Sequence, residues 1–346
     1  MSARAATPGN GLAFAALAAG SLVALALAIG LSVGIGDLPI PLGTTWTALT
    51  NRLGWTAVPL DRITETVIWD YRLSRALVAA FCGAGLALSG AILQSLLRNP
   101  LAEPYVLGIS AGASTGAVAI IILGLGAGAV SLSAGAFVGA FAAFCFVALL
   151  SNGTRGGADR TILAGVAASQ LFNAVTAYIV TTSGNAQQAR DVMFWLLGSF
   201  GGVRWPEFAL VAVIVGIGLV ACLCYATTLD TFSFGDETAA SLGVDVGKAR
   251  MVLFGLTAVM TATIVSMVGS IGFVGLIVPH AARALIGPLH LRLLPACALV
   301  GAVFMVLADV ASRALIPHQV LPIGVVTALV GVPFFSLILY RLQRAA

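Results

Sequence analysis

The chain has 346 residues, of which 60% are hydrophobic and only 9% are Asp, Glu, Lys or Arg. Soluble domains usually carry about 25% charged residues, so these few charges could not cover a water-facing surface. The composition excludes a soluble globular fold, a disordered chain and a nucleic-acid-binding protein, and it indicates an integral membrane protein. The formal net charge of +4 is too small to indicate an acidic partner.

Ten stretches are apolar enough to form helices across about 30 Å of hydrocarbon, which takes roughly 20 residues. They are 11–35, 72–96, 105–125, 130–150, 161–182, 207–228, 249–269, 273–287, 294–314 and 323–340. The first follows Arg4 and, at about 25 residues, exceeds the apolar core of a signal peptide, so we expect it to be retained as a span. The segment 273–287 is short and contains Pro279. We therefore predict an all-α membrane protein, a single domain over 1–346 built as a bundle of about ten transmembrane helices.

The acidic residues fit these spans. Of the 13 Asp and Glu residues, only Asp309 falls within a span, and the others lie in connections or at span ends. Arg313 follows Asp309 by four residues on the same helix face, so the two charges can neutralise each other. An even number of spans places both termini on one side of the membrane. With the termini in the cytoplasm, 10 of the 17 Lys and Arg residues lie inside, which is the expected but weak bias.

Cysteines and small residues occur inside the apolar stretches. We interpret all five cysteines as small buried hydrophobic side chains, not as metal ligands or disulfides: Cys82, Cys145, Cys222, Cys224 and Cys297. Small residues recur every four positions at Gly108, Gly112 and Gly116, at Gly135 and Gly139, and at Gly85 and Ser89. Such stripes let helix backbones pack closely within a membrane.

The sequence lacks the patterns expected for catalysis or nucleotide binding. The segment 243–249 resembles a phosphate-binding loop, but it has three residues between its glycines where four are needed, and Ala249 replaces the magnesium-binding hydroxyl. The histidines His280, His290 and His318 have no partner at metal-ligand spacing. We therefore expect no catalytic residue, no metal site and no cofactor bound by this chain.

The connection 229–248 carries a polar segment with helical propensity. Asp236–Leu242 is expected to form a short helix with acidic residues at its start and Gly243 as its C-terminal cap. The apolar side chains expected to be exposed on this connection are Phe232, Phe234 and Leu242. Two interpretations are open: an amphipathic turn lying on the bilayer, or a knob that fits a groove on a cytoplasmic partner.

Several motifs together resemble the FecCD, or BtuC-like, family of membrane-spanning permease subunits of binding-protein-dependent ABC importers for iron complexes and cobalamin. The stretches that carry the resemblance are Tyr71–Arg75, Gly83–Gln94 with Arg98–Pro104, residues 229–248, Gly272–Arg283 and Leu321–Gly324. This chain departs from the family pattern at Ser74, where proline is usual, and at Val320, where glutamate is frequent.

The resemblance implies a multi-pass protein of the bacterial cytoplasmic (inner) membrane that works as a homodimer. Its partners would be two ATPase subunits, which use ATP and Mg, and a substrate-binding protein docking outside. The expected cargo is an iron complex, meaning a ferric siderophore or haem, with cobalamin as the alternative. A secondary transporter without an ATPase is a further alternative, which would have to use Asp309 and the glycine-broken region Gly269–Gly275.

The resemblance also implies roles for particular residues. The positions that match the outer arginines, which dock the binding protein, are Arg72, Arg75 and Arg313. The positions that match the cytoplasmic gate, a turn stiffened by proline, are Asn99, Pro100 and Leu101. The expected contacts with the ATPase are Asp236, Glu237, Ala240, Leu242 and Gly243.

A polar stripe marks the fifth predicted span, where Gln170, Asn173 and Thr176 recur every three residues. Gln94 and Ser110 are candidates to join it. We predict that these five side chains line the pore, and the alternative is hydrogen bonding between helices. After this span, 191–199 and Trp205 are expected to form a short outer helix anchored at the interface by tryptophan.

Overall fold

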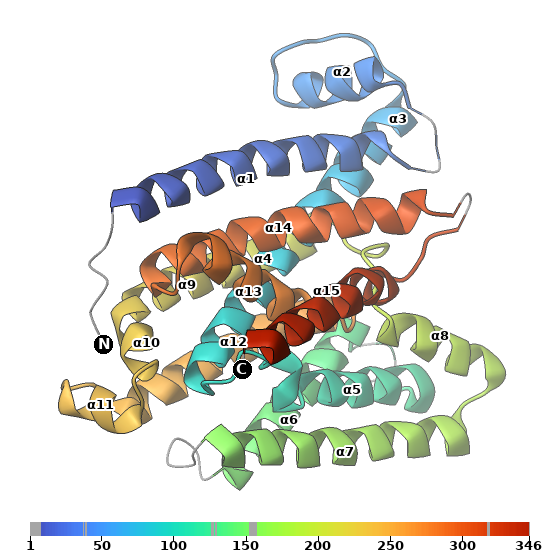
Figure 1. Cartoon of the computed structure of the whole chain (residues 1–346). Coiled ribbons are helices and arrows are strands. Elements are labelled where there is room, and N and C mark those ends of the chain that lie inside the picture. The colour runs from blue at the N-terminus through green and yellow to red at the C-terminus, as the bar shows by residue number, and fades with distance from the viewer. Residues whose placement is uncertain are drawn as a thin grey trace.

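The computed structural model describes residues 8–36, 38, 40–125, 128, 130–151, 158–316 and 319–345, and within these ranges every regular element is helical. The elements are α1 (Pro8–Gly34), α2 (Leu42–Arg52), α3 (Arg62–Thr66), η1 (Val67–Leu73), α4 (Ser74–Leu96), η2 (Pro104–Leu107), α5 (Ile109–Leu123), α6 (Leu132–Leu150), α7 (Ala158–Ser183), α8 (Ala186–Leu196), α9 (Trp205–Cys224), α10 (Ala226–Phe232), α11 (Asp236–Ser241), α12 (Val246–Val268), α13 (Val274–Ile286), α14 (His290–Ala314) and α15 (Ile323–Ala345). Figure 1 shows their arrangement as a bundle.

Each predicted span contains a helix of this bundle. In the described part of the chain, seven helices are long and apolar enough to cross a membrane, and three apolar helices are shorter: Ile109–Leu123, Val274–Ile286 and Ile323–Leu337. The prediction of an all-α, multi-pass membrane protein is confirmed. The predicted short segment 273–287 is α13, which keeps Pro279 inside the helix.

The bundle has two distinct ends. Helices α10 and α11 lie at one end, where α1 begins and α15 finishes (Figure 1). The opposite end carries α2 and α8. The first turn of α1 and the last turn of α15 therefore point to the same end of the bundle, as an even number of spans requires. We call these ends the α11 end and the α2 end.

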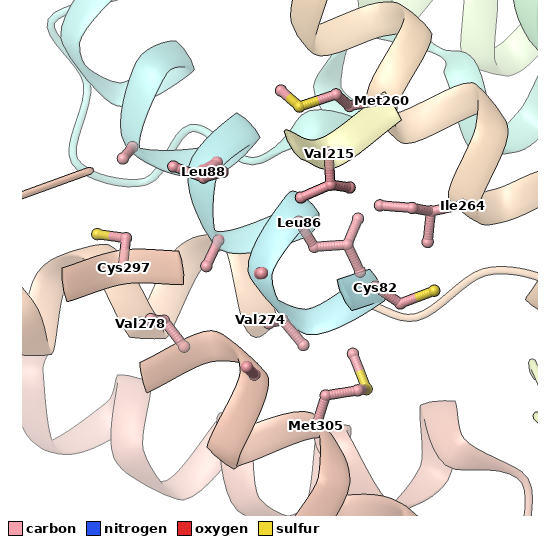
Figure 2. Packing of buried hydrophobic residues seen from close by; sticks show 14 of the residues in the cluster. Cys82, Leu86, Leu88, Val215, Met260, Ile264, Val274, Val278, Cys297 and Met305 are labelled. Atoms are coloured by element: carbon pink, nitrogen blue, oxygen red, sulfur yellow. The ribbon is translucent and has the colours of Figure 1, made fainter. Parts of the chain in front are cut away.

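Helix α4 occupies the centre of the bundle. Of the most apolar 18-residue window of Arg62–Leu96, 89% is buried, against 22% in α6, in α7 and in α9. Figure 2 shows Leu86 of α4 with Val215 and Ile264 on one side and Met305 of α14 on the other. Small residues permit this central position, because a Cβ on Gly83 would lie 2.1 Å from the Gly301 carbonyl oxygen of α14.

The predicted glycine stripes on α5 and α6 face each other. A Cβ on Gly112 would lie 2.3 Å from the carbonyl oxygen of Gly139, and one on Gly116 would lie 2.1 Å from that of Gly135. Gly108 does not belong to the stripe, because it precedes α5 with a φ of +71°. Close packing of these two helices is confirmed.

The prediction that all five cysteines are buried needs correction at two positions. Cys82, Cys222 and Cys297 are buried, but Cys145 is only half-buried and Cys224 is exposed. The last two lie on α6 and α9, which present most of their surface to the outside of the bundle. A small thiol can face lipid as readily as a core, so an apolar context did not establish burial.

Helix boundaries also differ from the prediction. The span predicted at 72–96 begins earlier, since α3, the π-helical turn η1 and α4 form one continuous helix from Arg62 to Leu96. Asp61 caps its start by accepting a hydrogen bond from the Thr64 amide at 3.2 Å. The outer helix predicted at 191–199 is α8, which starts earlier because Asn185 and Gln188 form a capping box. Trp205, predicted to belong to the same helix, is instead the first residue of α9.

Candidate functional site

Four arginines line one cavity at the α2 end of the bundle. The cavity has a volume of about 280 Å³, and its cationic side chains are Arg72, Arg75, Arg204 and Arg313. The three predicted docking arginines, which are far apart in sequence, are thus brought together. Asp37, whose neighbour Gly36 also lines the cavity, lies outside the described residues.

Asp309 joins two of these arginines. Its side chain is fully buried and pairs with Arg313 at 3.0 Å, as predicted from their spacing on α14. Arg75 of α4 also contacts it, with Nε donating to Oδ1 at 2.9 Å, a pair that the sequence prediction did not include. One carboxylate between two guanidinium groups leaves Arg75, Asp309 and Arg313 with one net positive charge, and Arg72 and Arg204 add two more to the cavity.

The last turn of α1 accepts hydrogen bonds from the other faces of the cluster. Arg72 donates to the carbonyl oxygens of Val33 at 3.0 Å and of Gly34 at 3.2 Å. Arg313 donates to Ser32, at 3.2 Å to its carbonyl oxygen and at 2.8 Å to its hydroxyl. Guanidinium groups satisfy the free carbonyls at a helix C-terminus and complement its dipole. The predicted docking arginines are thus each held by acceptors of their own chain, and their docking role stays a prediction.

Arg204 is a member of the cavity that the sequence prediction did not single out. Its guanidinium lies 3.8 Å from the ring centroid of Tyr71, a cation–π contact. Its Nη1 donates to the Val203 carbonyl oxygen at 2.6 Å. The available signal was its position on the predicted outer side, directly before Trp205, where α9 begins.

The predicted gate residues form an ordered turn between α4 and η2, at the opposite end of α4 from Arg75. The Asn99 amide donates to the Gln94 carbonyl oxygen at 3.1 Å, and the Leu101 amide donates to Asn99 Oδ1 at 2.9 Å. Pro100 and Leu101 are exposed. Burial raises the pKa of the nearby Glu103 carboxyl, and a hydrogen bond from the Phe273 backbone acts against this shift. The turn is held by its own hydrogen bonds, and its stiffness and its role as a gate stay predictions.

The predicted ATPase contacts gather on α11 and its C-terminal cap. Glu237, Ala240 and Leu242 are exposed. Gly243 is also exposed and has the positive φ of +85° expected of a cap. Asp236 is half-buried and accepts hydrogen bonds from Arg250 of α12 at 2.9 Å.

The apolar surface at α11 differs in one residue from the prediction. Phe234 is 74% exposed and Leu242 65% exposed, as expected. Phe232, however, is 1% exposed and packs in the main hydrophobic core. It lies on α10, whose buried face also carries Leu229, so the helical spacing of three residues turns both side chains inward.

The five predicted pore residues do not share one surface. Gln94 is 4% exposed and donates to the carbonyl oxygens of Gly275 and Leu276, each at 3.3 Å. Ser110 donates to Ser270 at 2.8 Å, and Thr176 is bonded to Thr115 at 2.8 Å. Gln94, Ser110 and Thr176 thus make hydrogen bonds between segments, which was the alternative interpretation of the polar stripe. Gln170 and Asn173 are exposed on α7, and lining of the pore stays a prediction for all five.

Comparisons with known proteins agree over most of the chain. The cobalamin import system permease protein BtuC of Halobacterium salinarum is 39% identical to this chain, over 93% of this chain and 88% of the relative's length. The hemin transport system permease protein HmuU of Yersinia pestis is 35% identical over 91% of this chain and 92% of its own. A metal-chelate type ABC transporter solved in an inward-facing conformation is 31% identical, with a TM-score of 0.81 over 94% of this chain and 98% of its own. The model of the FecCD transport family matches residues 23–341, and the chain therefore belongs to this family.

Proposed function

We propose that this chain is the membrane-spanning permease subunit of an ATP-driven importer that translocates an iron complex delivered by a substrate-binding protein. The observation that carries this proposal is the family match over residues 23–341, together with two surfaces at opposite ends of the bundle. The arginine cavity at the α2 end suits the acidic side chains of a docking protein. Phe234 and Leu242 at the α11 end suit an apolar groove on an ATPase subunit.

The working assembly in this proposal contains two copies of the chain and two ATPase subunits. ATP and magnesium bind to the ATPases, so the chain itself carries out no hydrolysis. The exposed polar side chains Gln170 and Asn173 on α7 support a path between the copies. With the α11 end in the cytoplasm of a bacterium, both termini also lie there, and the arginine cavity opens outside the inner membrane.

An iron chelate, such as a ferric siderophore or haem, is the proposed cargo, and cobalamin is the alternative. The relatives described above include permeases named for cobalamin and for hemin, so the family match supports both. No charged binding site for cargo is needed in the path itself, because the binding protein would select the cargo.

A secondary transporter that needs no ATPase has little support in the geometry. It would need an available carboxylate within the bundle to hold a coupling ion. Asp309 is instead occupied by Arg75 and Arg313.

The decisive experiment is uptake into proteoliposomes. The chain is reconstituted with and without its ATPase and binding protein, and labelled ferric siderophore, haem and cobalamin are offered in turn. We expect ATP-dependent uptake of one cargo only when all components are present. Uptake by the chain alone, without ATP, would contradict the proposal.

A further inference from the structure

A buried histidine joins three helices at the α11 end of the bundle. His290, the first residue of α14, is 2% exposed. Its Nδ1 lies 2.6 Å from Oδ1 of Asp230 on α10, and its Nε2 lies 2.6 Å from Oγ of Ser95 on α4. The His290 backbone amide donates to the same Asp230 oxygen at 3.0 Å. We propose that these three side chains, here called the Asp230–His290–Ser95 relay, transmit the movement of α11 to the gate turn.

The inference rests on the proposed function, because it assigns residues that connect the ATPase-facing helix to the gate. The proton positions follow from the partners. Asp230 as a carboxylate only accepts, so Nδ1 of His290 must carry a proton. Ser95 also lies 3.0 Å from the Ala91 carbonyl oxygen, and its hydroxyl therefore either donates to Nε2 or accepts from it. Both arrangements keep the two contacts of the ring intact.

The order carboxylate, imidazole and hydroxyl is also that of a hydrolytic triad, but the surroundings do not suit catalysis. Ser95 lies within the last turns of α4, where backbone amides are engaged in the helix. Free amides that could stabilise an oxyanion are therefore not available beside its hydroxyl. A mechanical role fits a buried position better than a chemical one.

One end of the relay moves with α11. Asp230 belongs to α10, and only residues 233–235 separate α10 from α11. Leu229 and Phe232 anchor α10 in the core, and α11 is held to α12 by the Asp236–Arg250 pair at 2.9 Å. A displacement of α11 would therefore be transmitted to Asp230 through a short connection.

The other end of the relay lies at the gate turn. The Arg98 amide donates to the Ser95 carbonyl oxygen at 3.3 Å, so Ser95 belongs to the turn that ends α4. Gln94, its neighbour, is fixed from α13 by Arg283, which donates to Gln94 Oε1 at 2.5 Å. The Arg98 guanidinium also lies beside Gly235, the residue before α11. A Cβ added to Gly235 would lie 3.3 Å from Nη1 of Arg98. Two routes therefore connect α11 to the last turn of α4.

Substitutions that keep one contact of the imidazole and remove the other test the relay. The amide of Asn reaches about as far as Nδ1, and that of Gln about as far as Nε2, so His290→Asn retains Asp230 and His290→Gln retains Ser95. Ser95→Ala and Asp230→Asn alter the outer members. Ser266→Ala is the control, because Ser266 is also buried and, among the described residues, donates within its own helix, to Thr263 at 2.8 Å.

The measurement is the number of cargo molecules moved per ATP hydrolysed by the full complex in proteoliposomes. The probe is a labelled ferric siderophore, or cyanocobalamin where the unaltered complex transports that instead. We expect each relay variant to lower this ratio roughly threefold to tenfold while ATP hydrolysis continues, the range that loss of one hydrogen bond can give. In the double variant Ser95→Ala with Asp230→Asn, the ratio of cargo to ATP should be no lower than in the more severe single variant, because the members of the relay act in series.

An unchanged ratio in Ser95→Ala would overturn the relay, and so would losses that multiply in the double variant. Should the His290 variants fail to assemble, Ser95→Ala, which removes a single hydroxyl, decides the question. A failure of the proposed function is distinguishable, because the unaltered complex itself would then transport nothing.

Discussion

Asp309 stabilises the arginine cluster from inside the bundle. Replacing it with Asn leaves Arg75 and Arg313 close together without their shared counter-charge. Removing one partner of a buried ion pair typically costs about 3–5 kcal/mol, so we expect Asp309→Asn to lower the thermal unfolding temperature in detergent markedly. Asp191→Asn, an exposed carboxylate on α8, should stay within about 0.5 kcal/mol. Equal unfolding temperatures for the two variants would contradict this account of Asp309.

Arg204 offers the sharpest test of docking. Charge reversal at Arg75 and Arg313 also breaks the Asp309 pairs, so weaker docking of that double variant would be ambiguous. Arg204 lines the same cavity without contacting Asp309. We expect Arg204→Glu to weaken binding of the substrate-binding protein about tenfold at low salt and less at high salt, as rim charges do.

Arg190→Glu makes the same charge change on α8, outside the cavity, and should bind normally. Binding can be measured by immobilising the permease complex and titrating the binding protein at two salt concentrations. Unchanged affinity of Arg204→Glu at low salt would remove Arg204 from the docking surface.

Sequence spacing predicted only the local part of this cluster. Asp309 and Arg313 are four residues apart on one helix, so their pairing follows from helical geometry. Arg75 is 234 residues from Asp309 in the chain, and only the packing of α4 against α14 brings them together. The relay was missed for the same reason, since His290 finds its partners on two distant helices.

The contact between α4 and α14 depends on the absence of a side chain at Gly83. Gly83→Ala would place a methyl group 2.1 Å from the Gly301 carbonyl oxygen, so the helices must separate. Overpacking of this kind costs about 1–3 kcal/mol. Gly216→Ala on α9 meets nothing within 4 Å and is the matched control. Thermal unfolding of both variants in detergent should show a loss for Gly83→Ala only, and similar values would refute this interpretation of the contact.

Helices were predictable where hydropathy alone decides them. The apolar interiors of the spans gave their positions, but the start of the continuous helix at Arg62 was hidden by Asp61, Glu65 and Asp70, which lower the local hydropathy. The position of the π-helical turn η1 depends on backbone hydrogen bonds that composition does not report. Helix caps such as Asn185 with Gln188 were readable in principle from their spacing.

At the scale of the whole molecule, the proposed ATPase contact is the apolar surface at α11, where Phe234 and Leu242 are exposed. We expect Leu242→Ala to reduce association with the ATPase subunit about tenfold, because a large exposed apolar side chain at an interface is a typical energetic centre. Ile217→Ala removes a similarly exposed side chain from α9, midway along the bundle, and should not affect association. Copurification over a range of ATPase concentrations measures the difference. Full association of Leu242→Ala would place the ATPase contact elsewhere.

Helices α4 and α14 are fastened to each other at three levels: Arg75 with Asp309, Gly83 with Gly301, and Ser95 with His290. The outer two levels are 20 residues apart on α4, which corresponds to about 30 Å, close to the thickness of the hydrocarbon layer. Two rods fixed together at three heights cannot slide past each other, although they can tilt as a single strut. In the proposed importer, a strut that pivots within the membrane would widen the path on one side as it narrows the path on the other. On this proposal, the stiffness of one helix pair would oppose opening of the path at both ends at once.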